Sequence, residues 1–258
     1  MTRALLILLP PSETKSDGGS RPFPGAAPGR WDALAPIRAQ VQADLVDLSS
    51  GDAELAAKAL KVSAKLAETE LRRNKQLGTG PLKAAAERYT GVLYDGLVAA
   101  SLEPDARRWL DDHVAVHSAL YGIVGAGEPI EAYRLSHDSR IGGETLRRRW
   151  REGVAALLAE HEGPLLDLRS KGYVEFGPLS DRAQHAWGDV VERLPDGSTR
   201  SLNHFNKLAK GELVRLLAER LATEPEPTSL EEVGEIVADR FAFGAVHHGV
   251  IEIVRLIN

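Results

Sequence analysis

An unbroken apolar segment near the start of the chain places the strongest constraint on the fold. Residues 4–9 read Ala-Leu-Leu-Ile-Leu-Leu and end at Pro10-Pro11. A short apolar run of this kind is typical of a strand buried on both faces of a sheet. Helical and strand-like segments alternate along the rest of the chain. The sequence therefore predicts an α/β fold with a mixed central sheet and flanking helices.

The other elements are predicted from apolar periodicity and from turn and capping residues. Helices are expected over 33–48, 52–59, 62–76, 81–87, 104–112, 144–161 and 205–221, and from Leu230, where Ser229 is an N-cap. Strands are expected over 87–97, 114–124, 164–168 and 250–256, with a β-hairpin formed by 185–194 and 198–204 around Pro195-Asp196-Gly197. The segment 10–29 has no periodicity, which is typical of a functional loop. We predict one domain over residues 1–258.

The composition is that of an ordinary globular protein, with 43% hydrophobic and 27% charged residues among 258. The absence of cysteine excludes disulfides, thiolate catalysis and cysteine-based metal sites. The apolar run that ends at Leu9 is too short for a membrane span or a signal peptide. We therefore expect a cytoplasmic protein with no membrane partner.

Charge is segregated along the chain, although the net charge is only −5. Residues 58–88 contain eight Lys or Arg and three Glu, whereas residues 223–239 contain six acidic residues and no basic one. A nucleic-acid partner would therefore have to bind to the basic segment 58–88.

The basic segment contains a turn, Gly78-Thr79-Gly80-Pro81, which ends one predicted helix and begins the next. Backbone N–H groups at such a turn can bind phosphate. Residues 62–88 therefore resemble a helix-hairpin-helix, an element that grips the nucleic-acid backbone. The DNA-binding residues would be Arg72, Lys75, Gly78, Thr79, Gly80 and Lys83. The same turn would also fit an ordinary connection between two helices.

Polar residues and all five tyrosines gather at predicted strand ends. Ser12-Glu13-Thr14-Lys15 follows one buried strand, and Arg169-Ser170-Lys171 follows another. Two cationic loops of this kind could share one anion, or each could be a solvated turn. The tyrosines could line a cleft or simply favour strand edges. The predicted anion or nucleotide pocket comprises Ser12, Thr14, Lys15, Tyr94, Tyr121, Tyr133, Arg134, Ser170 and Lys171, with Asp95 or Glu13 as the candidate catalytic carboxylate.

No metal or cofactor is predicted. His247 and His248 are neighbours on a predicted strand and would point to opposite faces, so they would not chelate one ion together.

Five motifs in a fixed order resemble the YaaA family. They are Pro10-Pro11-Ser12-Glu13-Thr14-Lys15, Tyr94-Asp95-Gly96-Leu97, Leu120-Tyr121-Gly122, Tyr133-Arg134-Leu135 and Lys207-Leu208-Ala209-Lys210-Gly211. The resemblance covers nearly the whole chain. It implies a cytoplasmic bacterial protein of the peroxide and oxidative stress response. It also implies an α/β fold with a helix-hairpin-helix and a positive groove that binds double-stranded DNA through backbone contacts.

Two functions follow as hypotheses. The first is a non-catalytic DNA-binding stress protein that uses the turn at 78–80 and its flanking cations. The second is an enzyme acting on nucleotides or nucleic-acid bases, such as an N-glycosidase, which needs a carboxylate near the cationic sugar and a pocket for the base. A nucleotide-like small molecule would then be the ligand. Convergence of residues 12–15, 95, 121, 133–134 and 169–173 in one closed pocket would favour the enzyme, whereas scattered positions would favour the DNA-binding protein.

Overall fold

A single mixed sheet forms the centre of the molecule. The computed structural model describes residues 4–21, 30–193, 199–200 and 203–256. The sheet has the strand order β11-β12-β9-β8-β1-β3-β4, with β10 paired to β9. β1 (Leu6–Leu9) pairs in parallel with β3 (Val114–Ser118) and β8 (Leu165–Asp167). Its four residues are at most 1% exposed, so the predicted interior strand is confirmed.

The remaining strands extend the sheet on both sides. β4 (Gly122–Gly125) runs antiparallel to β3, and β9 (His185–Arg193) runs parallel to both β8 and β12 (Val250–Arg255). β11 (Phe241–Phe243) is antiparallel to β12. Two small sheets pair β2 (Lys83–Ala84) with β5 (Pro129–Ile130), and β6 (Arg140–Ile141) with β7 (Glu144–Thr145). The predicted α/β fold with a mixed sheet is confirmed.

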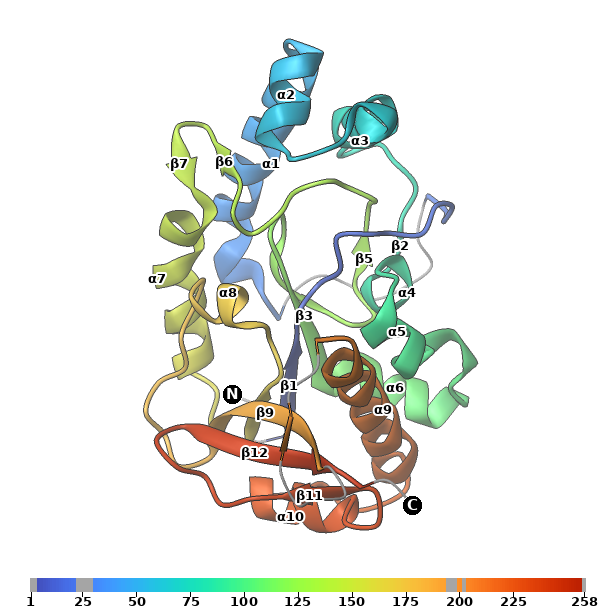
Figure 1. Cartoon of the computed structure of the whole chain (residues 1–258), viewed down its shortest axis with the longest axis vertical. Helices are drawn as coiled ribbons and strands as arrows, with labels where there is room; N and C mark the ends of the chain where they lie inside the picture. Colours follow the sequence, from blue (N-terminus) through green and yellow to red (C-terminus); the bar gives the residue numbers. More distant parts are fainter. Residues whose placement is uncertain (1–3, 22–29, 194–198, 201–202, 257–258) are drawn as a thin grey trace.

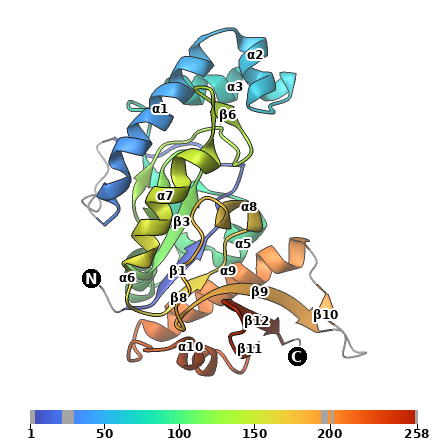
Figure 2. The same ribbon diagram turned by 90° about the vertical axis from the view of Figure 1, so that its left-hand side faces the viewer.

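Helices surround this sheet (Figure 1). They are α1 (Ala35–Ser50), α2 (Ala53–Ala59), α3 (Ala64–Lys75), α4 (Ala85–Arg88), α5 (Val92–Leu97), α6 (Pro104–His113), α7 (Leu146–Ala159), α8 (Lys171–Val174), α9 (Asn203–Leu221) and α10 (Leu230–Ile236), with short 3-10 turns at Asp32–Leu34 and Ala99–Ser101. Figure 2 shows α1, α2 and α3 at one end of the molecule, and α9 and α10 beside β12 at the other.

Two predicted elements between residues 81 and 97 are wrong. The expected strand over 87–97 is helical, because Leu93, Tyr94 and Leu97 recur at helical spacing and are buried. The expected helix over 81–87 is β2 followed by the first residues of α4. The turn after α3 therefore leads into a strand, and the predicted helix-hairpin-helix over 62–88 lacks its second helix.

A third prediction, the single strand over 114–124, is wrong because the chain reverses between β3 and β4. Gly122 has φ +70°, and a Cβ there would lie 2.7 Å from the Trp150 ring. By contrast, β9 and β10 (Thr199–Arg200) pair as the predicted antiparallel hairpin. Its predicted turn at 195–197 lies outside the described residues. Ser229 accepts a hydrogen bond from the Glu232 N–H and caps α10, as predicted.

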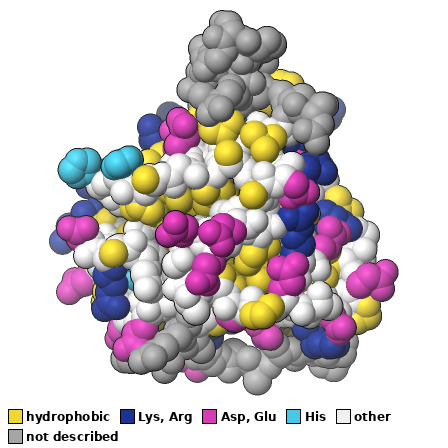
Figure 3. Space-filling model, turned by 90° about the horizontal axis from the view of Figure 1, so that it is seen from below, with side chains coloured by type: hydrophobic (Ala, Val, Ile, Leu, Met, Phe, Trp, Pro, Cys, Tyr) yellow, Lys and Arg dark blue, Asp and Glu magenta, His cyan; other side chains and the backbone are white. Residues whose placement is uncertain are grey.

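The segregated charges lie at opposite ends of the molecule. Basic α3 lies at the top of Figure 1, and α10, from the acidic segment 223–239, lies at the bottom. Figure 3 views this lower end, where acidic side chains are spread across the face.

Candidate functional site

Three parallel strands end at the same edge of the sheet. β1 lies between β8 and β3, so the loops that follow all three leave on one side. From β1 the chain continues toward β3, whereas from β8 it continues to β9 on the opposite side. Adjacent strands whose connections diverge in this way form the crevice where open α/β sheets bind ligands. We call the loops 10–16, 118–121, 131–136 and 168–173 the strand-end site.

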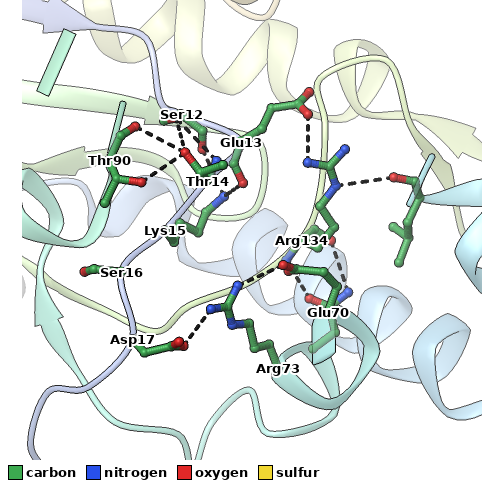
Figure 4. A network of polar contacts seen from close by, with 12 residues as sticks. Ser12, Glu13, Thr14, Lys15, Ser16, Asp17, Glu70, Arg73, Thr90 and Arg134 are labelled. Atoms are coloured by element: carbon green, nitrogen blue, oxygen red, sulfur yellow. Dashed lines mark hydrogen bonds and ion pairs between the residues drawn. The ribbon is translucent and has the colours of Figure 1, made fainter. Parts of the chain in front are cut away.

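Lys15 lies at the centre of this site. Its side chain is buried, with the residue 6% exposed, and Nζ donates to the carbonyl oxygens of Ser12 (3.0 Å) and Glu13 (3.2 Å) (Figure 4). Nζ also lies 4.0 Å from the centroid of the Tyr133 ring. Burial, with help from the charge of Arg134, lowers the pKa of Lys15 to about 7. The amine can therefore take up and release a proton at neutral pH.

Four tyrosines form a cluster beside Lys15, whose Nζ lies over the rings of two of them, Tyr89 and Tyr133. The Tyr133 hydroxyl hydrogen-bonds with those of Tyr89 (2.9 Å) and Ser118 (2.7 Å). The ring of Tyr121 contacts Tyr133, and the ring of Tyr94 contacts Tyr89. The predicted Tyr94, Tyr121 and Tyr133 are thus brought together. All four are at most 8% exposed, so they pack on one another rather than lining an open cleft.

Glu13 is the predicted carboxylate that lies in the strand-end site. It forms an ion pair with Arg134 (2.7 Å) and accepts a hydrogen bond from Ser136 Oγ (2.8 Å). Partial burial acts to raise the pKa of Glu13, but the bonds from Ser136 and Arg134 outweigh it, and the net shift is downward. Glu13 is therefore ionised at neutral pH. The other candidate, Asp95, lies on the exposed face of α5.

Three hydroxyl groups gather beside Lys15. Thr14 Oγ1 lies 3.2 Å from Ser12 Oγ and accepts a hydrogen bond from Thr90 Oγ1 (3.0 Å). Thr14 is exposed, and Ser12 and Thr90 are partly buried. Ser12 and Thr14 are predicted pocket residues, whereas Thr90 was not among them. Hydroxyls placed beside a cation are suited to an anionic ligand.

The second predicted loop lies at the same edge but contacts β9. Ser170 immediately precedes α8, and Lys171 Nζ lies 5.7 Å from the centroid of the Trp187 ring. Lys210 is buried, like Lys15, and lies next to this loop, because its Nζ donates to the Leu168 carbonyl (3.0 Å). Burial lowers the pKa of Lys210 to about 8. Sequence reasoning named Lys210 only within a family motif and not among the site residues, although its position on the apolar helix face with Leu213 and Val214 was a usable signal.

A buried ion pair anchors the loop after β8. Arg169 and Asp167 are both fully buried, and Arg169 Nη2 lies 2.6 Å from Asp167 Oδ2. Arg169 Nη1 also donates to His117 Nδ1 (2.8 Å) on β3. Burial and the charge of Arg169 lower the pKa of His117, which is therefore neutral. The network connects the ends of β3 and β8.

The predicted phosphate-binding turn is occupied by a carboxylate of the chain itself. The N–H groups of Gly78 and Gly80 donate to Glu131 (2.9 and 2.8 Å), and Thr79 Oγ1 donates to Gln76 O (3.0 Å). Glu131 is only 6% exposed, so it fills the place expected for phosphate. Sequence reasoning missed this residue, although an acid between Ile130 and Ala132 is a usable signal for a buried carboxylate.

The predicted DNA-contacting cations divide into two groups. Arg72 and Lys75 are exposed on α3. Lys83 instead donates to Ser16 Oγ (3.0 Å) and to Asp17 O (2.8 Å), which holds the loop after β1 against β2.

Within the described residues, no group of three His, Cys, Asp or Glu side chains could hold a metal ion. The described helices also include none that is long and apolar enough to cross a bilayer.

A family profile described as "Peroxide stress protein YaaA" matches residues 5–244. The chain belongs to the YaaA family. A UPF0246 protein of Corynebacterium glutamicum is 37% identical over 245 residues, covering 90% of this chain and 91% of the relative. A UPF0246 protein of Streptomyces coelicolor is 35% identical over 239 residues, covering 91% and 90%. The family resemblance predicted from the five motifs is confirmed.

Proposed function

We propose that the strand-end site binds a nucleotide-like ligand and hydrolyses its N-glycosidic bond. The observation that supports this best is the buried amine of Lys15, which lies on the face of Tyr133 and has a pKa of about 7. A structural lysine gains little from such a position, whereas a proton-transfer group needs a pKa near the working pH.

The neighbouring residues divide the remaining tasks. In the reaction, water adds to the anomeric carbon as the C–N bond breaks, and the base leaves with a proton. The ionised carboxylate of Glu13 would stabilise the cationic sugar, and Lys15 would transfer the proton. Ser12 and Thr14, with Lys171, would hold a phosphate. We assign the buried tyrosines to positioning Lys15, because their low exposure leaves little ring surface for a base to stack on.

The test uses the full chain and a panel of nucleosides and nucleoside monophosphates. Thermal denaturation would detect binding, and chromatography would detect the free base. We expect Lys15→Met to abolish base release, whereas Lys65→Met, a matched change on the exposed face of α3, leaves it intact. Absence of both binding and base release with the wild-type protein would contradict the proposal.

A second candidate is binding of duplex DNA within a peroxide stress response in the cytoplasm. The exposed Arg72 and Lys75 on basic α3 support the DNA binding, and the family's description supports only the stress response. In this case the contacts would come from the helix face and not from the turn at 78–80, because Glu131 already accepts from that turn. Arginine and lysine contacts of this kind recognise the phosphate backbone without reading bases.

A further inference from the structure

Trp187 differs from the other three tryptophans of the chain, because part of its side chain faces solvent. Trp31, Trp109 and Trp150 are at most 5% exposed, whereas Trp187 is only partly buried. It lies on β9, which has a paired strand on each side, and it is in register with Asp167, the last residue of β8. An indole left partly uncovered on an interior strand, level with the edge where the loops of the strand-end site begin, can be reached by a ligand.

The Trp187 ring is held in one orientation beside the strand-end site. Its Nε1 donates a hydrogen bond to the carbonyl oxygen of Arg169 (2.8 Å), in the loop that follows β8. The side chain of Arg169 is itself fixed by the buried ion pair with Asp167. The ring is therefore preorganised, so a ligand that packs on it does not have to order this side chain first.

Two ammonium groups lie next to the same ring. Nζ of Lys171 is 5.7 Å from its centroid, and Nζ of Lys210 is 5.8 Å from it. Lys210 is buried and donates to the Leu168 carbonyl, so it supports the loop. Lys171 is exposed and forms no ion pair with any of the described residues. The neighbouring Ser170 is also exposed, and its hydroxyl does not cap α8. Lys171 and Ser170 can therefore both meet an anion.

An exposed cation beside a partly buried aromatic ring is suited to a nucleotide, because the base stacks on the ring while the phosphate meets the charge. The four tyrosines of the site are too buried to accept a base, and Trp187 offers the ring surface that they lack. Stacking strengthens with the overlapping ring area, and indole has two fused rings, as a purine has. We propose that Trp187 holds the base of the ligand, that Lys171 holds its phosphate, and that the site prefers purine to pyrimidine nucleotides. This inference rests on the nucleotide binding proposed above and adds the residue that selects the base.

The experiment follows the tryptophan fluorescence of the full chain during titration with purine and pyrimidine nucleoside monophosphates, and with ribose 5-phosphate, which has no base. Purine nucleotides should quench the emission and bind most tightly, because they cover Trp187. Isothermal titration should show that Trp187→Leu weakens their binding about tenfold, a usual contribution of one stacked base, and that Trp187→Phe retains part of it. Phe243→Leu on β11, a matched loss of a partly exposed ring, should leave binding unaltered.

Ribose 5-phosphate separates a stacking role of Trp187 from a purely structural one. Its binding should fall in Lys171→Ala and stay unchanged in Trp187→Leu, because it carries a phosphate but no base. Equal weakening of ribose 5-phosphate and of purine nucleotides by Trp187→Leu would overturn the proposal, as would nucleotide binding without a preference for purines. Quenching without base release would support the stacking site and contradict the hydrolase, whereas base release without quenching would do the reverse. No binding of any probe would overturn both.

Discussion

At the scale of single residues, the chain buries charged groups at the carboxyl edge of its sheet. Lys15 rests on an aromatic ring and two carbonyl oxygens, and its most direct charged neighbour, Arg134, is also positive. Asp167 and Arg169, by contrast, neutralise each other directly. The surroundings of Lys15 lower the pKa of its amine, whereas the Asp167–Arg169 ion pair holds the loop after β8 in place.

The buried amine predicts an unusual dependence of stability on pH. The pKa of Lys15 is about 7 in the folded chain and about 10.4 when unfolded. Between these values only the unfolded chain holds the proton, so stability rises with pH, by at most about 1.4 kcal/mol per pH unit. Below pH 7 the full cost of burying the charge remains. Urea denaturation from pH 6 to 10 should show this rise relative to Lys15→Met. Parallel curves for the two proteins would refute it.

The ion pair predicts a large loss of stability for Asp167→Asn. The substitution leaves the buried charge of Arg169 without its counter-charge, which costs about 3–5 kcal/mol. The control is Asp105→Asn, which removes an exposed pair with Arg108 and should change the free energy of unfolding by less than about 0.5 kcal/mol. Equal effects in chemical denaturation would mean that the buried pair is not needed.

At the scale of elements, α5 and α9 cross with their backbones in contact. A Cβ at residue 211 would lie 1.9 Å from the Leu93 carbonyl oxygen, and one at residue 96 would lie 2.6 Å from that of Leu208. Both glycines belong to the motifs that resemble the family. Their role here is close packing, which places the neighbouring Lys210 against the end of β8.

Because of this crossing, we predict that Gly211→Ala destabilises the protein, which is the opposite of the usual effect of this change in a helix. In an ordinary helix interior, alanine is more stabilising than glycine by about 1 kcal/mol. Here the added methyl group would force the helices apart, so we expect a loss of about 1–3 kcal/mol. Thermal and urea denaturation give the sign directly. A stabilised variant would show that the helices separate without cost.

At the scale of the whole molecule, α3 and α10, from the basic and the acidic segment of the sequence, lie at opposite ends (Figure 1), and the face at the α10 end has acidic side chains interspersed with basic ones (Figure 3). If the protein binds DNA as proposed, this separation would turn the α3 end toward the duplex although the net charge is −5. Any duplex would meet the end that contains α3, and α10 would face away from it.

The DNA hypothesis predicts that the basic side chains of α3 cause the salt dependence of DNA affinity. Each phosphate contact contributes about −0.9 to the slope of log K against log salt, so replacing both Arg72 and Lys75 by Ala should reduce its magnitude by about 2. Lys83→Ala should matter less, because its amine is bonded to Ser16 and Asp17. Fluorescence anisotropy with a labelled duplex would measure this, with Arg240→Ala near α10 as control. Equal slopes for all variants, or no binding at low salt, would exclude α3 as the contact surface.

The sequence alone determined the elements whose signal is local. The interior strand β1, the capped helix α10 and the family motifs follow from apolar runs, capping residues and fixed spacing, and all are confirmed. The strand predicted over 87–97 failed because aromatic and branched residues fit both periodicities. In this segment, packing of α5 against α9 stabilises the helical conformation over the strand.

Only the tertiary structure decided which partners the polar groups meet. Glu131 lies 51 residues from Gly80 along the chain, yet it occupies the N–H groups that the local sequence offers to phosphate. Tyr133 meets Lys15 in the same way, from a distant segment. The physical reason is that desolvation and hydrogen bonding depend on atoms brought together by the fold, whereas secondary-structure propensity depends on neighbours in sequence.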